Sequence, residues 1–187
     1  MEKIVEYFDE RGPQNTEATL EIARRRAKEL GIRSILVATT KGNTGAQAAQ
    51  IFKGFNLIVV THSIGFNQPD FQELEEEQRK IITAQGGKIL TCPHAFGGIG
   101  RAVRKKYGTF ELDDIIANTL RIFGEGMKVC CEMVLMATDA GLIRTDEEVI
   151  AIGGTGRGAD TAAVIKPANV QTFFDLRVKE ILCKPRL

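Results

Sequence analysis

The stretch from Ile35 to Ala49, ILVATTKGNTGAQAA, constrains the fold more than any other part of the chain. An apolar run stops at Thr39-Thr40, the segment Lys-Gly-Asn-Thr-Gly follows, and an Ala-rich segment of helical character comes directly after it. This order predicts a buried strand, a tight turn and the start of a helix. Such a turn directs unpaired backbone N–H groups and the positive end of a helix dipole at one point, so it binds an anion well.

Two further apolar runs end in polar or glycine-rich loops. Leu57–Thr61 (LIVVT) leads into the loop His62-Ser63-Ile64-Gly65-Phe66, and Val149–Ile152 (VIAI) leads into the loop Gly153–Thr161 (GGTGRGADT). Apolar runs without alternation are typical of strands that are buried on both faces, as in a parallel sheet covered by helices. Because open α/β folds bind ligands at the carboxyl ends of their strands, the three loops together indicate a ligand crevice.

The rest of the chain alternates helical and strand-like patterns. The periodicity predicts helices within residues 16–30, 46–54, 69–85, 99–107, 112–122 and 128–140, a short helix around 173–174, and strands at 88–91, 162–165 and 177–183. Pro69 is the expected first residue of its helix, and residues 177–183 are the expected terminal edge strand. Residues 3–9 fit either a short helix turn or an edge strand.

The connection at residues 153–161 is too short for a helical crossover. It is therefore predicted to join neighbouring antiparallel strands, which gives a mixed edge on an otherwise parallel sheet. We predict a single α/β domain over residues 1–187, with a three-layer α/β/α fold and a mixed, mostly parallel sheet.

Composition argues against several classes of function. The net charge of +1 argues against nucleic-acid binding, because counterion release needs a concentrated basic face. No apolar run is long enough to span a bilayer, and the start MEKIVEYFDERG lacks the apolar core of a signal peptide. We therefore expect a cytoplasmic protein that does not bind membranes.

The four cysteines show no metal-binding spacing. Cys92, Cys130, Cys131 and Cys183 form neither a CxxC pair nor a zinc-like pattern with the two histidines. They are predicted to be reduced thiols, with Cys130-Cys131 packed in the core. No metal site is expected.

Two of the loops carry groups that suit a phosphate. The first supplies hydroxyls, glycines and a lysine, at Thr39, Thr40, Lys41, Gly42, Asn43, Thr44 and Gly45. The late loop lets the backbone approach an anion closely and adds a guanidinium, at Gly154, Thr155, Gly156, Arg157 and Gly158. Asp160 and Thr161 either hold the shape of this loop or bond to hydroxyls of a ligand. A plain glycine-rich hairpin with an exposed Arg157 is the competing interpretation.

The common nucleotide motifs are absent. A Walker loop has the pattern GxxxxGK[ST], whereas Lys41 precedes its glycine here. The segment Gly154–Gly158 contains GxGxG, but no helix is predicted after it, so it lacks the context of a dinucleotide-binding turn.

The first loop loosely resembles the T-x-[ST]-G-x-T phosphate loop of flavodoxins, which wraps the FMN phosphate, with Lys41 in place of a hydroxyl. A closer resemblance covers most of the chain. Thr39–Gly45 and GGTGRGADTA are similar to the two effector-phosphate loops of the pyruvate kinase carboxyl-terminal domain. With THSIGF, CPHAFGG and GMKVCCEM, they identify the chain as a member of the archaeal family of stand-alone pyruvate-kinase C-terminal-like domains. This resemblance implies an α/β/α fold and an FMN-sized ligand at the strand ends. It implies no kinase activity, because the catalytic barrel domain of pyruvate kinase is lacking.

For a flavin ring, the chain offers flat side chains in its loops. The side chains expected to stack on the ring or bond to it are His62, Phe66, His94 and Phe96, and Ser63 and Gly65 of the same loop are expected to bind the cofactor. Each Phe is alternatively an anchor of its loop into the core, and each His is alternatively a surface residue. Glu132, in the apolar helix, is either a buried hydrogen-bond partner of a loop or a ligand group, because an unpaired buried carboxylate is costly.

We predict that the chain binds a phosphorylated small molecule, FMN by preference. The rival hypothesis is a regulatory or assembly domain that binds a sugar phosphate effector and does no chemistry. A third hypothesis is a hydrolase or isomerase with His62 or His94 as general acid/base, although no nucleophile–base–orienter set is visible. Self-association is left open.

Overall fold

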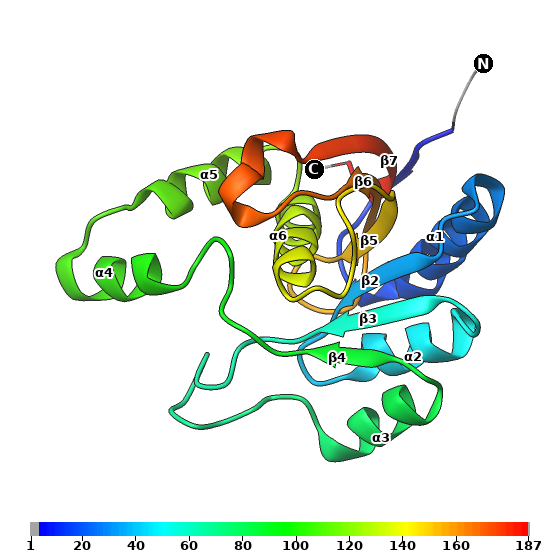
Figure 1. Ribbon diagram of the computed structural model, residues 1–187, viewed down its shortest axis with the longest axis horizontal. Coiled ribbons are helices and arrows are strands. Elements are labelled where there is room, and N and C mark those ends of the chain that lie inside the picture. Colours follow the sequence, from blue (N-terminus) through cyan, green and yellow to red (C-terminus); the bar gives the residue numbers. More distant parts are fainter. Residues whose placement is uncertain (1–3, 187) are drawn as a thin grey trace.

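A seven-stranded sheet in the order β1-β7-β6-β5-β2-β3-β4 organises the computed structural model, which describes residues 4–186 (Figure 1). The strands are β1 (Glu6–Phe8), β2 (Ser34–Ala38), β3 (Asn56–Val60), β4 (Lys88–Leu90), β5 (Val149–Gly153), β6 (Thr161–Lys166) and β7 (Arg177–Pro185). Every neighbouring pair is parallel except β5–β6 and β6–β7. The predicted mixed, mostly parallel sheet is therefore confirmed.

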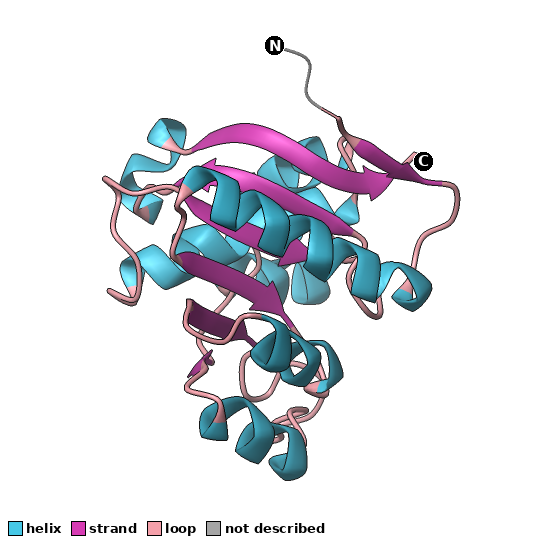
Figure 2. Ribbon diagram, turned by 90° about the vertical axis from the view of Figure 1, so that its right-hand side faces the viewer, coloured by secondary structure: helices cyan, strands magenta, loops and turns pink. Residues whose placement is uncertain are grey.

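Helices cover both faces of the sheet, as Figure 2 shows in a view along its side. One layer contains α1 (Thr16–Leu30), α2 (Asn43–Ile51) and α3 (Glu76–Ala84), and the other contains α5 (Leu112–Arg121) and α6 (Glu125–Asp139). Along β2, Ile35 and Val37 pack into the first layer and Leu36 into the second. Burial on both faces explains why this strand shows no polar alternation.

Helix α6 is the most deeply buried helix of the described chain. Its core side chains include Cys130, Cys131 and Leu135. All four cysteines are free, as predicted, and burial raises the pKa of the Cys131 thiol to about 11. Thiols of this kind pack in the core and react poorly.

The predicted helix start at Pro69 is wrong, because α3 begins at Glu76. Residues 69–75 instead fold back on the loop after β3. Asp70 has a positive φ of 58°, which is incompatible with a helix, and the backbone N–H of Gly65 donates to the carbonyl of Phe71. The peptide N–H of Glu75 donates to the carbonyl of Lys41 at 3.0 Å, which ties this segment to the first loop.

The predicted edge position of residues 177–183 is also wrong. Strand β1 pairs in parallel with the end of β7, with Glu6 opposite Cys183, so β1 is the edge strand. This decides the alternative for residues 3–9 in favour of a strand, although Lys3 lies outside the described residues.

The remaining elements are α4 (Ile99–Tyr107) and two 3₁₀ turns, η1 (Pro13–Asn15) and η2 (Val170–Asp175). In the apolar stripe of α5, Ile116 packs against the core, whereas Leu112, Ile115 and Ile122 are exposed. Within residues 4–186, no helix is both long and apolar enough to cross a membrane.

Candidate functional site

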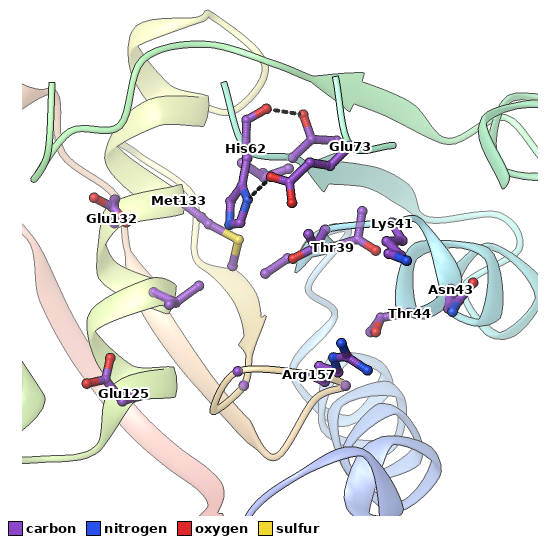
Figure 3. A pocket seen from close by; sticks show the side chains of 18 of the residues that line it. Thr39, Lys41, Asn43, Thr44, His62, Glu73, Glu125, Glu132, Met133 and Arg157 are labelled. Carbon is purple, nitrogen blue, oxygen red and sulfur yellow. Dashed lines mark hydrogen bonds and ion pairs between the residues drawn. The ribbon is translucent and has the colours of Figure 1, made fainter. Parts of the chain in front are cut away.

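A cavity of about 700 Å³ opens at the carboxyl edge of the sheet, between the loops that follow β2, β3 and β5 and the side of α6 (Figure 3). The strand order reverses here, because β3 and β4 lie on one side of β2 and β5 lies on the other. Open α/β sheets bind ligands at such a point.

Most residues predicted for the site line this cavity. They are Thr39, Thr40, Lys41, Asn43, Thr44, His62, Phe66, His94, Gly154, Gly156, Arg157 and Gly158. Other predicted residues, all of them described, do not contribute to its wall: Gly42, Gly45, Ser63, Gly65, Phe96, Thr155, Asp160 and Thr161. The three loops thus meet at one place, as their positions after buried strands indicated.

The first loop presents the free start of α2 to the cavity. Gly42 adopts a φ of 112°, which turns the chain into the helix. Thr39 Oγ1 accepts the N–H groups of Gly42 at 3.1 Å and Gly45 at 3.4 Å. Among the described residues, the N–H groups of Asn43 and Thr44 have no acceptor. Two backbone donors at a positive helix end are therefore available to an anion.

The late loop holds a cation on the same side of the cavity. Arg157 is exposed, and no carboxylate of residues 4–186 pairs with it. Figure 3 shows its side chain close to Thr44, on the opposite side of the cavity from α6. Gly158, with a φ of 70°, packs directly on Pro13, and Thr16 Oγ1 accepts the N–H of Ala159 at 3.0 Å. The start of α1 therefore fixes the base of this loop.

Asp160 and Thr161 hold the shape of the late loop. The Asp160 carboxylate is fully buried and accepts the backbone N–H groups of Gly12 at 3.1 Å and Thr155 at 3.2 Å. The Thr161 hydroxyl donates to the other carboxylate oxygen of Asp160 at 2.9 Å. The sequence left two roles open for Asp160 and Thr161, and these contacts match the role of holding the shape of the loop.

A cluster of flat groups forms another part of the wall. The rings of His62 and Phe66 stack with centroids 4.0 Å apart, and His94 lies on Phe66 at 5.0 Å. The guanidinium of Arg101 lies 4.3 Å from the Phe66 centroid. His62 Nδ1 is held 2.6 Å from the carboxylate of Glu73. The predicted aromatic side of the site is thus built from Phe66 and both histidines.

Phe96 has a different place. Its ring is buried and packs edge-on against Phe173, with centroids 5.7 Å apart, in the core beneath α6. The sequence left two roles open for Phe96, and this position matches the role of an anchor that holds its loop to the core. A large apolar side chain fills this part of the core.

Sequence reasoning expected a partner for the buried carboxylate of Glu132, but it missed Lys128 as that partner. Lys128 Nζ bonds to Glu132 one turn later, and Glu132 also accepts the N–H of Phe96 at 2.9 Å. His94 Nδ1 lies 3.6 Å from the same carboxylate. Burial alone would raise the pKa of Glu132, but the contacts with His94 and the charge of Lys128 outweigh it and lower the pKa to about 2. In the sequence, the i,i+4 spacing of Lys128 and Glu132 in an apolar helix was the signal that could have indicated this pair.

Further residues that sequence reasoning did not assign to the site also line the cavity. From α6 come the apolar Val129, Met133 and Met136, and from other elements come Gln47, Glu73 and Arg101. Met133 and Met136 follow Val129 at helical spacing, so all three lie on one face of α6. Sequence periodicity alone cannot say that this face borders a cavity, because such a stripe usually packs in the core.

Comparisons with known proteins give one family match and similar solved structures. The family model of the pyruvate kinase alpha/beta domain matches residues 17–165. Among solved structures, Cryptosporidium parvum pyruvate kinase in complex with ADP is similar at 15% identity and a TM-score of 0.43, over 82% of this chain and 24% of that one. A second solved structure of a pyruvate kinase from Cryptosporidium parvum matches at 14% identity and a TM-score of 0.42, over 82% of this chain and 23% of that one. The chain thus spans less than a quarter of these enzymes. On the family match, which covers most of its length, the chain belongs to the pyruvate kinase alpha/beta domain family.

Proposed function

We propose that the chain binds a phosphate monoester of a flat organic group, FMN by preference, at the carboxyl edge of its sheet. The observation that carries this proposal is the pairing of two loops. Within residues 4–186, the N–H groups of Asn43 and Thr44 and the guanidinium of Arg157 have no partner, and they border one cavity from the loops after β2 and β5. Donors of both kinds favour a doubly charged phosphate over a neutral ligand.

The phosphate end has its own electrostatic support. Lys41 and Arg157 line the cavity, and within residues 4–186 neither pairs with a carboxylate. The helix dipole adds about 0.3–1 kcal/mol for an anion at the start of α2, and each hydrogen bond to a charged group adds about 1.5–3 kcal/mol. The Thr39 hydroxyl already accepts two N–H groups, so its own hydrogen is free to donate to a ligand oxygen.

The rest of the cavity suits a flavin. Its volume of about 700 Å³ lies within the range of small-molecule sites. Val129, Met133 and Met136 provide an apolar wall, and His62 and Phe66 provide flat faces. When bound, a flavin supplies one- or two-electron transfer. These residues would hold its ring and keep water away from it.

The test is the uptake of FMN by the purified chain. Titration of wild-type protein should quench flavin fluorescence, whereas riboflavin, which lacks the phosphate, should bind much more weakly. The double variant Arg157→Ala/Thr44→Ala should bind FMN about 100-fold more weakly. It keeps the backbone N–H of Thr44 but loses the Arg157 guanidinium and the Thr44 hydroxyl, which together contribute about 3 kcal/mol of charge-assisted bonding. Arg144→Ala is the matched control, since Arg144 is exposed on the loop before β5 and pairs with Asp146.

Equal FMN affinity in the wild type and the double variant would reject the phosphate site. If FMN does not bind at all, sugar phosphates are the next ligands to test by thermal shift. A sugar phosphate that stabilises the wild type but not the double variant would keep the phosphate site and replace FMN with the effector of the rival hypothesis.

A further inference from the structure

Large apolar side chains are exposed on a helical arm, defined here as residues 99–123, which contains α4 and α5. Figure 1 shows α4 and the start of α5 projecting away from the sheet. Of the 15 exposed large hydrophobic residues in the described chain, seven lie in this arm: Ile99, Tyr107, Phe110, Leu112, Ile115, Ile122 and Phe123. Such a concentration is unusual for a surface that faces only water.

Helix α4 has an apolar face without a core to cover it. Ile99, Val103 and Tyr107 are spaced four residues apart, so they share one face of the helix. None of the residues of α4 is buried, and Ile99 is 84% exposed. An isolated helix of this length is marginal in water and normally depends on packing of its apolar face.

Helix α5 has one wide apolar face, of which the fold buries only one side. Ala117 is buried against the core, and Ile116 packs beside it. Leu112, Ile115 and Ile122, which directly follows α5, border this side and are 57–74% exposed. The exposed part of the face therefore has no partner among the described residues.

The area of the arm matches what a dimer needs. Seven large apolar side chains, each more than half exposed, offer on the order of 700 Å² in total, close to the ~800 Å² per partner of a standard interface.

The charges of the arm are complementary to each other. The last turn of α4 carries Arg104, Lys105 and Lys106, whereas the first turn of α5 carries Asp113 and Asp114. Arg104 and Asp114 already pair within one arm. Asp114 is only 5% exposed and Asp113 lies against Gly100, so both acidic groups contact α4 of their own chain. With a net charge of only +1 per chain, long-range repulsion between copies is weak.

We propose that the arm is a two-fold interface with a second copy of this chain. The occupant is a second copy because the exposed apolar area is close to what one partner of a stable dimer buries, and the net charge of +1 gives little repulsion between copies. The proposal is independent of the ligand at the cavity.

The experiment is a measurement of molecular mass by light scattering across a dilution series of the purified chain. The wild type should give twice the chain mass of 20.5 kDa at high concentration. Ile115→Glu/Ile122→Glu should halve this mass, because it places charges in the apolar stripe of α5. Ile64→Glu is the matched control, since Ile64 is also more than half exposed but lies in the loop after β3, and it should leave the mass unchanged.

Circular dichroism checks that the arm variant is folded, which is expected because its altered side chains are exposed in the single chain. Hydrogen exchange on the wild type gives a second measurement that needs no variant, and amides of residues 99–123 should exchange more slowly at high concentration. A wild type that stays monomeric overturns the proposal. A dimer that persists in Ile115→Glu/Ile122→Glu also overturns the proposal.

Discussion

Glu132→Ala is expected to lower the free energy of unfolding by about 3–5 kcal/mol, the usual cost of removing one partner from a buried ion pair. Glu132 and Lys128 are 5% and 7% exposed at their side chains. Loss of the carboxylate leaves the ammonium of Lys128 buried without its partner, and it also leaves the N–H of Phe96 without an acceptor. Urea unfolding monitored by circular dichroism measures the effect.

Glu125→Ala provides the matched control on the same helix. Glu125 pairs with Arg121 at 3.0 Å, but its side chain is 48% exposed, so its removal should cost less than about 1 kcal/mol. The double variant Lys128→Met/Glu132→Leu should regain much of the lost stability, because it removes both charges and fills the same space. Similar losses for Glu125→Ala and Glu132→Ala would contradict the buried pair.

The dependence of the unfolding free energy on acidic pH provides a second measurement of the Glu132 carboxylate. Its pKa in the folded chain is about 2, below the ordinary 4.5, so the ionised form stabilises the fold at neutral pH. This contribution is fully present above pH 4.5 and is lost as the pH falls towards 2. In Glu132→Gln, the decline of stability across this window should be shallower than in the wild type.

The local patterns of the chain predict the sheet and the loop cluster well. Ile35–Thr39, Leu57–Thr61 and Val149–Ile152 read as buried strands because helices cover both of their faces in the structure. Once the strands are parallel, their loops must share one edge. The meeting of Thr44 and Arg157 at the cavity follows from this order, although 113 residues separate them along the chain.

Features that depend on distant partners could not be read from the sequence. The pairing of β1 with β7 joins the two ends of the described chain, and no local pattern encodes it. The helical pattern after Pro69 is overridden by two contacts that hold residues 69–75 as a loop. The N–H of Glu75 donates to the carbonyl of Lys41, and the carboxylate of Glu73 bonds to the ring of His62. Tertiary contacts of this kind regularly outweigh local propensity.

The same limit applies to the chemistry of the cavity. The sequence placed His94 at a strand end and left Glu132 between two roles, but it could not show that they meet. In the structure, the Glu132 carboxylate joins α6 to the loop after β4 through the N–H of Phe96 and the ring of His94. One buried carboxylate therefore positions a wall of the cavity, which explains why the costly burial of Glu132 and Lys128 is tolerated.

Asp160→Ala is expected to cost about 2–5 kcal/mol of stability and also to weaken ligand binding at the late loop. The substitution leaves the N–H groups of Gly12 and Thr155 without an acceptor, at about 1–3 kcal/mol each. Because Asp160 ties the segment before α1 to the turn that carries Arg157, its loss should also free that turn. Denaturant unfolding measures the first effect, and FMN titration measures the second.

Asp160→Asn separates the shape of the loop from its charge. The amide oxygen of Asn can still accept both backbone N–H groups, while its NH₂ group can donate to the Thr161 hydroxyl, which then acts as acceptor. We therefore expect the Asn variant to retain most of the stability and the ligand affinity that the Ala variant loses. If the Asn variant loses as much as the Ala variant, the negative charge of Asp160 stabilises the loop more than its hydrogen bonds do. If neither variant changes FMN affinity, the late loop does not contribute to the site, and Arg157 has no role in holding a phosphate.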